Sequence, residues 1–270
     1  MEDWRLVISR PESGAMNMAI DEAILLAVAR GTALPTVRFY QWAEPAITLG
    51  YFQSYKKEID FTRTTEQGVD IIRRLSGGRA VLHHQELTYS VAAPENNRVV
   101  GGTVVQAYLA ISRGIVRGLR EMSIPAEITA GKKTKGAITA ACFDSPSRHE
   151  ITVLGKKLVG SAQIRKYNSI LQHGSVVIEN EPDLLFSCLN YDNEAARTEG
   201  RNYFVHRSAS LADILGYTPE FQEVAETLKN SLTGELGINL IPHGITDVEM
   251  TEALELYRSK YSTDAWNKKR

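Results

Sequence analysis

The order of the expected strands and helices is the feature that most constrains the fold of this 270-residue chain. A doubly wound α/β sheet needs helices that alternate regularly with its strands. Here the strand-like segments cluster between a few long helical segments, without a βαβ repeat. Strands are expected at residues 36–40, 46–51, 68–74, 87–91, 150–153, 157–163 and 170–178. The sequence therefore predicts an α+β fold rather than a doubly wound one.

Four segments have the apolar periodicity or composition of helices. They are residues 16–29, 103–122, 219–232 and 247–261. The second of these contains Gly114 and Gly118, although a glycine inside a helix costs about 1 kcal/mol relative to alanine. The spacing of four residues between the two glycines predicts that this face packs closely against a sheet.

Composition and charge exclude several classes of protein. A formal net charge of −1 gives no overall electrostatic attraction to nucleic acid or to an anionic membrane. The two cysteines, Cys142 and Cys188, are too few for a disulfide framework, which favours a reducing compartment. No apolar stretch has the length of a membrane span, and the acidic start Met1–Arg5 is unlike a signal peptide. We therefore expect a cytoplasmic protein.

The turn Ser76-Gly77-Gly78 is the first candidate binding element. Paired glycines permit positive φ angles and let a ligand approach the main chain, whose N–H groups can bind a carboxylate, a phosphate or a developing oxyanion. A plain hairpin turn is the more common explanation for two glycines. The turn is flanked by Arg73, Arg74, Arg79, His83 and His84, which favours a ligand site. The pattern matches neither a phosphate-binding P-loop nor a dinucleotide fingerprint.

A metal site at His83, His84 and Glu86 is not expected. Adjacent residues on a strand point to opposite faces, so these side chains cannot easily converge on one ion. His173 lies within an apolar strand-like segment. It is either a histidine buried in the core or a polar group at one end of an apolar pocket.

A thiol and a lysine are the candidate reactive groups. Cys188 lies in an apolar run and is expected to be an inert core residue, whereas Cys142 lies between a basic loop and a turn-like run. An ordinary thiol with a pKa of about 8.5 is only a few per cent thiolate at pH 7. Lowering that pKa by about 1.5 requires roughly 2 kcal/mol. A cation about 4 Å away, for which Lys157 is the candidate, supplies up to ~4 kcal/mol at an effective dielectric constant of about 20.

These segments together resemble the lipoate–protein ligase A and octanoyltransferase family, over nearly the whole chain. The most specific pieces are residues 73–83, 155–163 and 171–175, and further similarity runs from Asn17–Ala23 to Lys260–Asn267. The run Ala141–Ser147 looks like that of the cysteine-dependent octanoyltransferases of Gram-positive bacteria. Arg79, where ligases usually have a third glycine, points the same way.

The resemblance implies a biotin/lipoate protein ligase catalytic fold, similar to class II aminoacyl-tRNA synthetases, with mixed sheets flanked by helices. Its catalytic residues would be Cys142, which accepts octanoate as a thioester, and Lys157, which lowers the thiol pKa and helps to deprotonate the incoming amine. The implied substrate-binding residues are Arg73, Ser76, Gly77, Gly78, His83, Gly160, Ser161, Ala162 and His173. One departure is His84, where the family usually carries aspartate.

The same resemblance implies the partners. The donor would be octanoyl-acyl carrier protein and the acceptor a lysine of the glycine cleavage H protein or another lipoyl domain, with no cofactor or metal. Lys132, Lys133 and Lys135 form a basic loop that could attract an acidic carrier protein. We expect a monomer with a catalytic domain over residues 1–245 and a helical extension over 246–270 that packs on it.

Two other functions stay open from the sequence, and two more are disfavoured. One is an ATP-dependent lipoate–protein ligase that activates free lipoate as an acyl-adenylate. A second is an octanoyl amidotransferase from H protein to dehydrogenase E2 subunits. A non-catalytic acyl-binding module on the same fold is disfavoured because Cys142 and Lys157 are both present. Biotin ligation is disfavoured because residues 76–79 lack the biotin loop of glycines and arginines.

Overall fold

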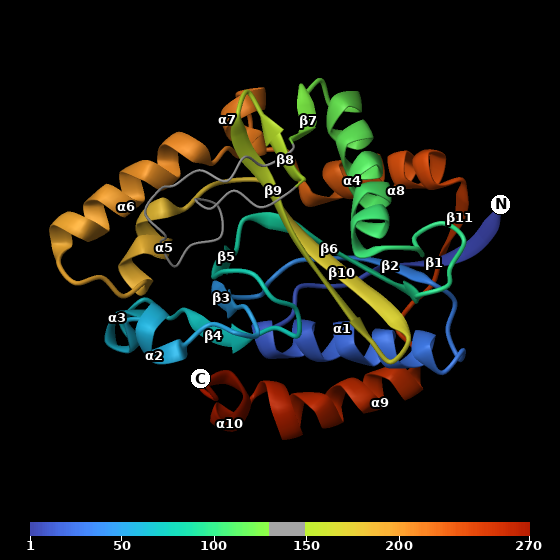
Figure 1. Cartoon of the computed structure of the whole chain (residues 1–270), viewed down its shortest axis with the longest axis horizontal. Coiled ribbons are helices and arrows are strands. Elements are labelled where there is room, and N and C mark those ends of the chain that lie inside the picture. Colours follow the sequence, from blue (N-terminus) through green and yellow to red (C-terminus); the bar gives the residue numbers. More distant parts are fainter. Residues whose placement is uncertain (130–148) are drawn as a thin grey trace.

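The computed structural model describes residues 1–129 and 149–270, which form two mixed sheets covered by helices (Figure 1). The larger sheet has the strand order β11-β1-β2-β6-β10-β9-β8-β7. In that order the strands are Ile238–Pro242, Glu2–Ile8, Thr36–Tyr40, Glu86–Pro94, Ser169–Val177, Lys156–Lys166, Glu150–Val153 and Ala126–Thr129. Strand β1 pairs in parallel with β11 and β2, and the other pairs are antiparallel. The predicted α+β class is confirmed.

The smaller sheet lies beside the larger one and holds the glycine turn. Its order is β4 (Asp70–Arg73), β3 (Ala46–Leu49) and β5 (Val81–His83), with β3 parallel to β4 and antiparallel to β5. The turn Ser76-Gly77-Gly78 connects β4 to β5. Figure 1 shows this small sheet next to the middle of β9 and β10. The turn is therefore carried between the two sheets.

Helix α1 (Gly14–Ala29) runs along one face of the large sheet and is buried on nearly all sides. It begins after Ser13, whose hydroxyl accepts a hydrogen bond from the Met16 N–H at 3.3 Å. The helices α9 (Asp247–Leu256) and η2 (Tyr257–Tyr261) cover its other side. Because two layers enclose α1, its polar residues Asp21 and Glu22 are buried as well.

Helix α4 (Val104–Glu121) packs against α8 (Phe221–Leu236) on the opposite face of the large sheet. The expectation that Gly114 and Gly118 face a sheet is wrong. A Cβ atom on Gly114 would lie 2.6 Å from the Leu232 side chain, and one on Gly118 would lie 2.6 Å from the Ser231 hydroxyl. The two glycines let a second helix approach closely, and their spacing alone does not identify the element that approaches.

Two short hairpin turns set the register of β8, β9 and β10. Leu154 and Gly155 connect β8 to β9, and Tyr167 and Asn168 connect β9 to β10, with φ between 50° and 77° at all four residues. Positive φ at both central residues is the pattern of a type I′ turn, whose twist matches that of the strands. The central residues of the first turn, Leu154 and Gly155, fall in the gap between the strands expected at 150–153 and 157–163.

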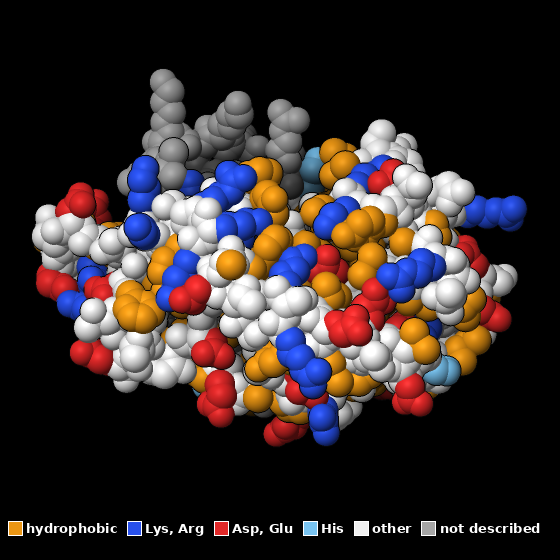
Figure 2. All heavy atoms as spheres, turned by 90° about the horizontal axis from the view of Figure 1, so that it is seen from below, with side chains coloured by type: hydrophobic (Ala, Val, Ile, Leu, Met, Phe, Trp, Pro, Cys, Tyr) orange, Lys and Arg blue, Asp and Glu red, His pale blue; other side chains and the backbone are white. Residues whose placement is uncertain are grey.

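Six further helices are described. They are α2 (Tyr55–Glu58), α3 (Phe61–Glu66), α5 (Pro182–Cys188), α6 (Glu194–Arg207), α7 (Leu211–Leu215) and α10 (Asp264–Asn267). Figure 1 shows α5 and α6 at one edge of the molecule, on the side of the small sheet. Within residues 1–129 and 149–270, no helix combines the length and the apolar character that crossing a membrane requires. The face seen from below carries interspersed positive and negative side chains, in keeping with the small net charge (Figure 2).

Candidate functional site

A cavity lies where β9 and β10 face the small sheet and the glycine turn. Six of the expected substrate-binding residues line it: Gly78, His83, Gly160, Ser161, Ala162 and His173. Strand pairing explains part of this grouping, because Ala162 is opposite His173 and Gly160 is opposite Ser175. The sequence segments that were singled out separately therefore meet at one site.

The glycine turn is held in place from two sides. Gly78 has a φ of 98°, which favours glycine, and its carbonyl lies against Gly50 so closely that a Cβ there would be 2.0 Å from the oxygen. Arg74 donates hydrogen bonds to the carbonyls of Gly77 and Arg79, both at 2.8 Å. The main chain of this turn is thus fixed before any ligand binds.

The expected role of Arg73 does not match its position, because Arg73 is fully buried and does not line the cavity. Its guanidinium donates to carbonyl oxygens of the loop 50–53, and also to those of Trp266 and Asn267 near the C-terminal end. Arg74, the first residue after β4, lies in the cavity wall instead. The sequence assigned Arg73 to the site, whereas its neighbour Arg74 is the arginine that faces the cavity.

The polar side chains in the cavity wall are bonded to other protein groups. His83 lies 2.7 Å from the Thr48 hydroxyl and 2.8 Å from a carboxylate oxygen of Glu86. The Trp42 indole stacks on the His83 ring with 4.1 Å between ring centres, and its N–H donates to the Thr88 hydroxyl at 2.8 Å. Because these groups are already paired, the wall presents mainly carbon to the cavity.

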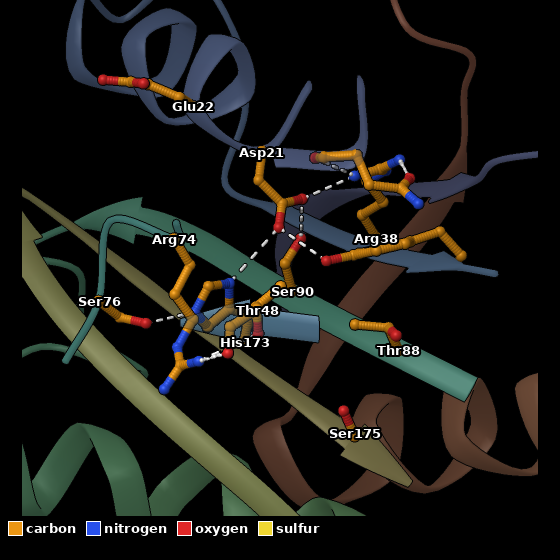
Figure 3. Close-up of polar contacts among 12 residues, drawn as sticks. Asp21, Glu22, Arg38, Thr48, Arg74, Ser76, Thr88, Ser90, His173 and Ser175 are labelled. Atoms are coloured by element: carbon orange, nitrogen blue, oxygen red, sulfur yellow. Dashed lines mark hydrogen bonds and ion pairs between the residues drawn. The ribbon is translucent and has the colours of Figure 1, made fainter. Parts of the chain in front are cut away.

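His173 is the centre of a second buried set of contacts (Figure 3). Its Nε2 lies 2.5 Å from the Ser76 hydroxyl oxygen, and its Nδ1 lies 3.6 Å from a carboxylate oxygen of Asp21. Burial lowers the pKa of His173, although Asp21 partly opposes this, so the ring is neutral at pH 7. Burial also opposes the charge of Asp21, yet Arg38 and His173 hold the pKa of this carboxyl below its usual range.

Lys157 is buried near the start of β9 and forms an ion pair with Glu150 of β8. Its Nζ lies 2.7 Å from the Glu150 Oε1. The Lys157 carbonyl also accepts a hydrogen bond from the Ala209 N–H at 2.9 Å. Lys157 is therefore a buried cation with a carboxylate beside it, not a lysine on the solvated surface.

The two cysteines differ in what the structure describes. Cys142 and the basic residues Lys132, Lys133 and Lys135 lie outside the described residues. Cys188 is fully buried on α5, and burial raises the pKa of its thiol. Cys188 is therefore the inert core thiol that the sequence predicted.

His83 and His84 point to different surroundings, as the alternation along a strand predicts. His83 lines the cavity, whereas the His84 Nδ1 lies 2.7 Å from a carboxylate oxygen of Glu181. No group of three histidine, cysteine, aspartate or glutamate side chains suited to a metal ion occurs in residues 1–129 and 149–270.

Four buried residues of the site were not identified from the sequence as site residues. Asp21 lies in the expected helix 16–29 without an assigned role, and Arg38, Thr88 and Glu150 were not singled out. Each comes from a different element. Thr88 lines the cavity, Glu150 pairs with Lys157, and Asp21, which pairs with Arg38, faces His173. The only local signal is a charged residue within an otherwise apolar segment, as at Asp21 and Arg38.

Comparisons with known proteins agree with this fold. The family described as "Lipoyl protein ligase A/B catalytic domain" matches residues 13–233. The chain is 43% identical over 271 residues to an octanoyltransferase LipM of Moorella thermoacetica, covering 100% of this chain and 99% of the relative. A second octanoyltransferase LipM, from Kyrpidia tusciae, is 41% identical and covers 99% of both chains.

The fold is similar to that of solved lipoylation enzymes. A structure of a bi-partite lipoate protein ligase and its E2 lipoyl domain from Thermoplasma acidophilum contains a chain that superposes with a TM-score of 0.84. The two chains are 24% identical, and the match covers 99% of this chain and 97% of the other. This likeness establishes the biotin/lipoate ligase type of fold that the sequence predicted.

Proposed function

The chain belongs to the lipoyl protein ligase A/B catalytic domain family, and we propose that it transfers octanoyl from octanoyl-acyl carrier protein to a lysine of the glycine cleavage H protein. Its full-length relatives are octanoyltransferases, so it is an acyltransferase of protein lipoylation. The proposal adds the donor, the acceptor and a thioester on Cys142. No ATP is needed, because a thioester donor is already activated.

The main support for this proposal is that the polar side chains of the cavity wall are already paired within the protein. Nine polar side chains line the cavity, and each one has a hydrogen-bond partner elsewhere in the protein. An entering acyl chain therefore meets no unsatisfied polar atom of these side chains and does not have to break a hydrogen bond to bind. A site built to bind a polar substrate would instead leave donors or acceptors directed into the cavity.

The proposed reaction has two transfers. The Cys142 thiolate attacks the thioester carbonyl of the donor, and the carrier thiol leaves with a proton. The acceptor lysine, as a free amine, then attacks the new thioester, so that Cys142 leaves as a thiolate and an amide forms. The amine gives up its proton in this step, and Lys157 is the proposed group that assists both the thiolate and the proton transfer.

The pairing of Lys157 with Glu150 weakens the effect that the Lys157 cation alone would have on the pKa of the Cys142 thiol. A lone cation lowers the pKa of a nearby thiol, but a carboxylate 2.7 Å from the Lys157 Nζ cancels part of that field. The pair still presents directed N–H donors in a buried place, where they can stabilise charge that develops during transfer. Glu150 is therefore proposed to keep Lys157 oriented while limiting its effect on the thiol.

Intact-protein mass spectrometry after incubation with octanoyl-acyl carrier protein, without ATP, tests this proposal. We expect a gain of one octanoyl group that hydroxylamine reverses, that Cys142→Ala abolishes and that Cys188→Ala retains. Retention of the adduct in Cys142→Ala would exclude the thioester on this residue. Modification of an acceptor only when ATP and free acid are supplied would identify a ligase instead.

The donor and acceptor are tested with purified pairs. Octanoyl-acyl carrier protein and octanoyl-H protein are offered separately as donors, with H protein or an isolated E2 lipoyl domain as the acceptor. Transfer from acyl carrier protein to H protein is the expected result. Transfer only from octanoyl-H protein to the E2 domain would identify an amidotransferase.

A further inference from the structure

Asp21, His173 and Ser76 form a chain of contacts that joins helix α1 to the glycine turn (Figure 3). They come from α1, from β10 and from the connection between β4 and β5, and all three side chains are buried. His173 lies in the cavity wall, whereas Asp21 and Ser76 lie behind it. The order of groups is carboxylate, imidazole and hydroxyl.

Asp21 is charged, and both of its carboxylate oxygens accept hydrogen bonds from neighbouring side chains. One carboxylate oxygen accepts hydrogen bonds from Arg38 and from Ser90, both at 2.8 Å. The other accepts from the Tyr40 hydroxyl at 3.0 Å and faces the Nδ1 of His173 at 3.6 Å. These contacts fix the orientation of the Asp21 carboxylate relative to His173.

The charge of Asp21 selects one form of the neutral His173 ring. With the proton on Nδ1, the positive end of the N–H bond points to the carboxylate oxygen. With the proton on Nε2, the lone pair of Nδ1 would face the same negative oxygen, which is repulsive. The Nε2 atom is therefore an acceptor, and the Ser76 hydroxyl donates its proton to it.

Ser76 is the point at which the glycine turn is anchored. Its carbonyl accepts a hydrogen bond from the Tyr51 N–H at 2.9 Å, and its hydroxyl is bound to His173. The next two residues, Gly77 and Gly78, have the greatest backbone freedom of any residue type and cannot hold their own conformation. The orientation of their main-chain groups beside the cavity therefore depends on contacts from outside the pair: Arg74 holds the carbonyls of Gly77 and Arg79, and Ser76 anchors the start of the turn.

We propose that Asp21 is a positioning residue for acyl transfer, which sets the protonation of His173 so that Ser76 holds the glycine turn beside the acyl cavity. This inference rests on the proposed octanoyl transfer for its kinetic consequence. Its structural consequence, the proton on Nδ1 of His173, does not depend on that function.

The direct test is the tautomer of His173 in the full-length, ¹⁵N-labelled protein. Long-range ¹H–¹⁵N NMR correlations distinguish a protonated ring nitrogen from an unprotonated one, and the loss of signals in His173→Gln assigns the ring. We expect a protonated Nδ1 and an unprotonated Nε2 at pH 7. A protonated Nε2 in the wild-type protein would overturn the proposal, and this measurement requires no variant of Asp21 to fold.

The kinetic test is a double-mutant cycle with octanoyl-acyl carrier protein as the donor. Asp21→Asn and Ser76→Ala should each lower kcat/KM by about fivefold to thirtyfold, the effect of one lost buried hydrogen bond. If Asp21 acts through Ser76, Asp21→Asn should cost little more in the Ser76→Ala protein. Losses that multiply in the double variant would contradict a shared pathway.

Glu249→Gln is the matched control. Glu249 forms a buried ion pair with Arg5, as Asp21 does with Arg38, but it lies on α9 and has no contact with the glycine turn. We expect lower stability but an unchanged kcat/KM of the folded protein. An equal kinetic loss in Glu249→Gln would show that any broken buried pair slows transfer. If the wild-type protein transfers no octanoyl, the proposed function fails while the tautomer result stands.

Discussion

Lys157 lies 2.7 Å from Glu150, measured between the Nζ and Oε1 atoms, and both side chains are buried where β8 and β9 pair. The two-residue turn at Leu154 and Gly155 sets this pairing. A cation that the sequence suggested as the partner of a thiol is thus already the partner of a carboxylate. The two side chains should have opposite effects on any thiolate near them.

Lys157→Ala should raise the pH needed to alkylate Cys142, and Glu150→Gln should lower it. The first change removes a cation, whereas the second leaves that cation without its counter-charge. The measurement is the rate of iodoacetamide modification against pH in a Cys188→Ala background, followed by intact mass. If both variants shifted the pH dependence of alkylation in the same direction, the Lys157–Glu150 pair would not be acting electrostatically on the Cys142 thiol.

Thr88→Val should weaken binding of the octanoyl donor. The Thr88 hydroxyl accepts from the Trp42 indole N–H and donates to Glu86, so its loss leaves polar groups unpaired in the cavity wall. Each unpaired group costs about 1–3 kcal/mol. We expect a raised KM together with a lower Tm. Thr227→Val, on an exposed part of α8, is the control, and equal changes in it would refute this account.

Arg73→Lys should lower the free energy of unfolding by about 2–4 kcal/mol, because an ammonium cannot satisfy the carbonyls that the guanidinium reaches from the loop 50–53 to Asn267. Urea unfolding measures this loss. A residue that binds the substrate directly would give a different result, namely a raised KM in a protein of unchanged stability. The same substitution at the exposed Arg113 should leave both quantities near their wild-type values.

Stability should fall as the pH is lowered from neutrality. Burial holds the pKa of His173 below its ordinary value of about 6.5, so the unfolded chain takes up a proton there before the folded protein does. The stability that comes from a neutral, buried His173 is present above about pH 6.5 and is lost as the pH falls from there toward the lower pKa of the folded protein. The lowered pKa of Asp21 adds a second loss below about pH 3.9, the ordinary aspartate value.

Urea unfolding at pH 7.5 and pH 5.5 measures the histidine contribution. His173→Gln should reduce the difference in stability between the two pH values. His243→Gln, at an exposed position, should retain the wild-type difference. A wild-type protein that is equally stable at both pH values would contradict the assignment to His173.

Segments with a strong local pattern were predictable from the sequence. Strand β2 was placed at its observed bounds, and the prediction for α4 extended one residue beyond each end of the helix. The glycine turn, His83 and His173 were also identified, because glycine pairs and isolated polar residues in apolar strands are visible in one segment. Cys188 was correctly assigned to the core.

The contacts between distant segments were not predictable. The burial of Asp21 was not predicted, because the apolar periodicity of residues 16–29 indicates one buried face, whereas α9 and η2 cover the other face as well. Arg73 and Arg74 are equivalent in the sequence, and only the structure at the end of β4 shows which one meets the cavity. Strand β11 was missed because it is short and pairs with β1, for example Ile238 with Glu2, which lies 236 residues earlier in the chain. No local pattern records a pairing over such a distance.

The Arg73 contacts also bear on the order in which the protein matures. Asn267, the partner of the Arg73 main-chain N–H, is synthesised 194 residues later. At about 5–20 residues per second, a ribosome needs roughly 10 to 40 s for that stretch. During this time Arg73 has its partners in the loop 50–53 but lacks those at Trp266 and Asn267. The contacts that hold the base of the glycine turn are therefore completed only after residues 266–267 have been synthesised and have folded back onto β4.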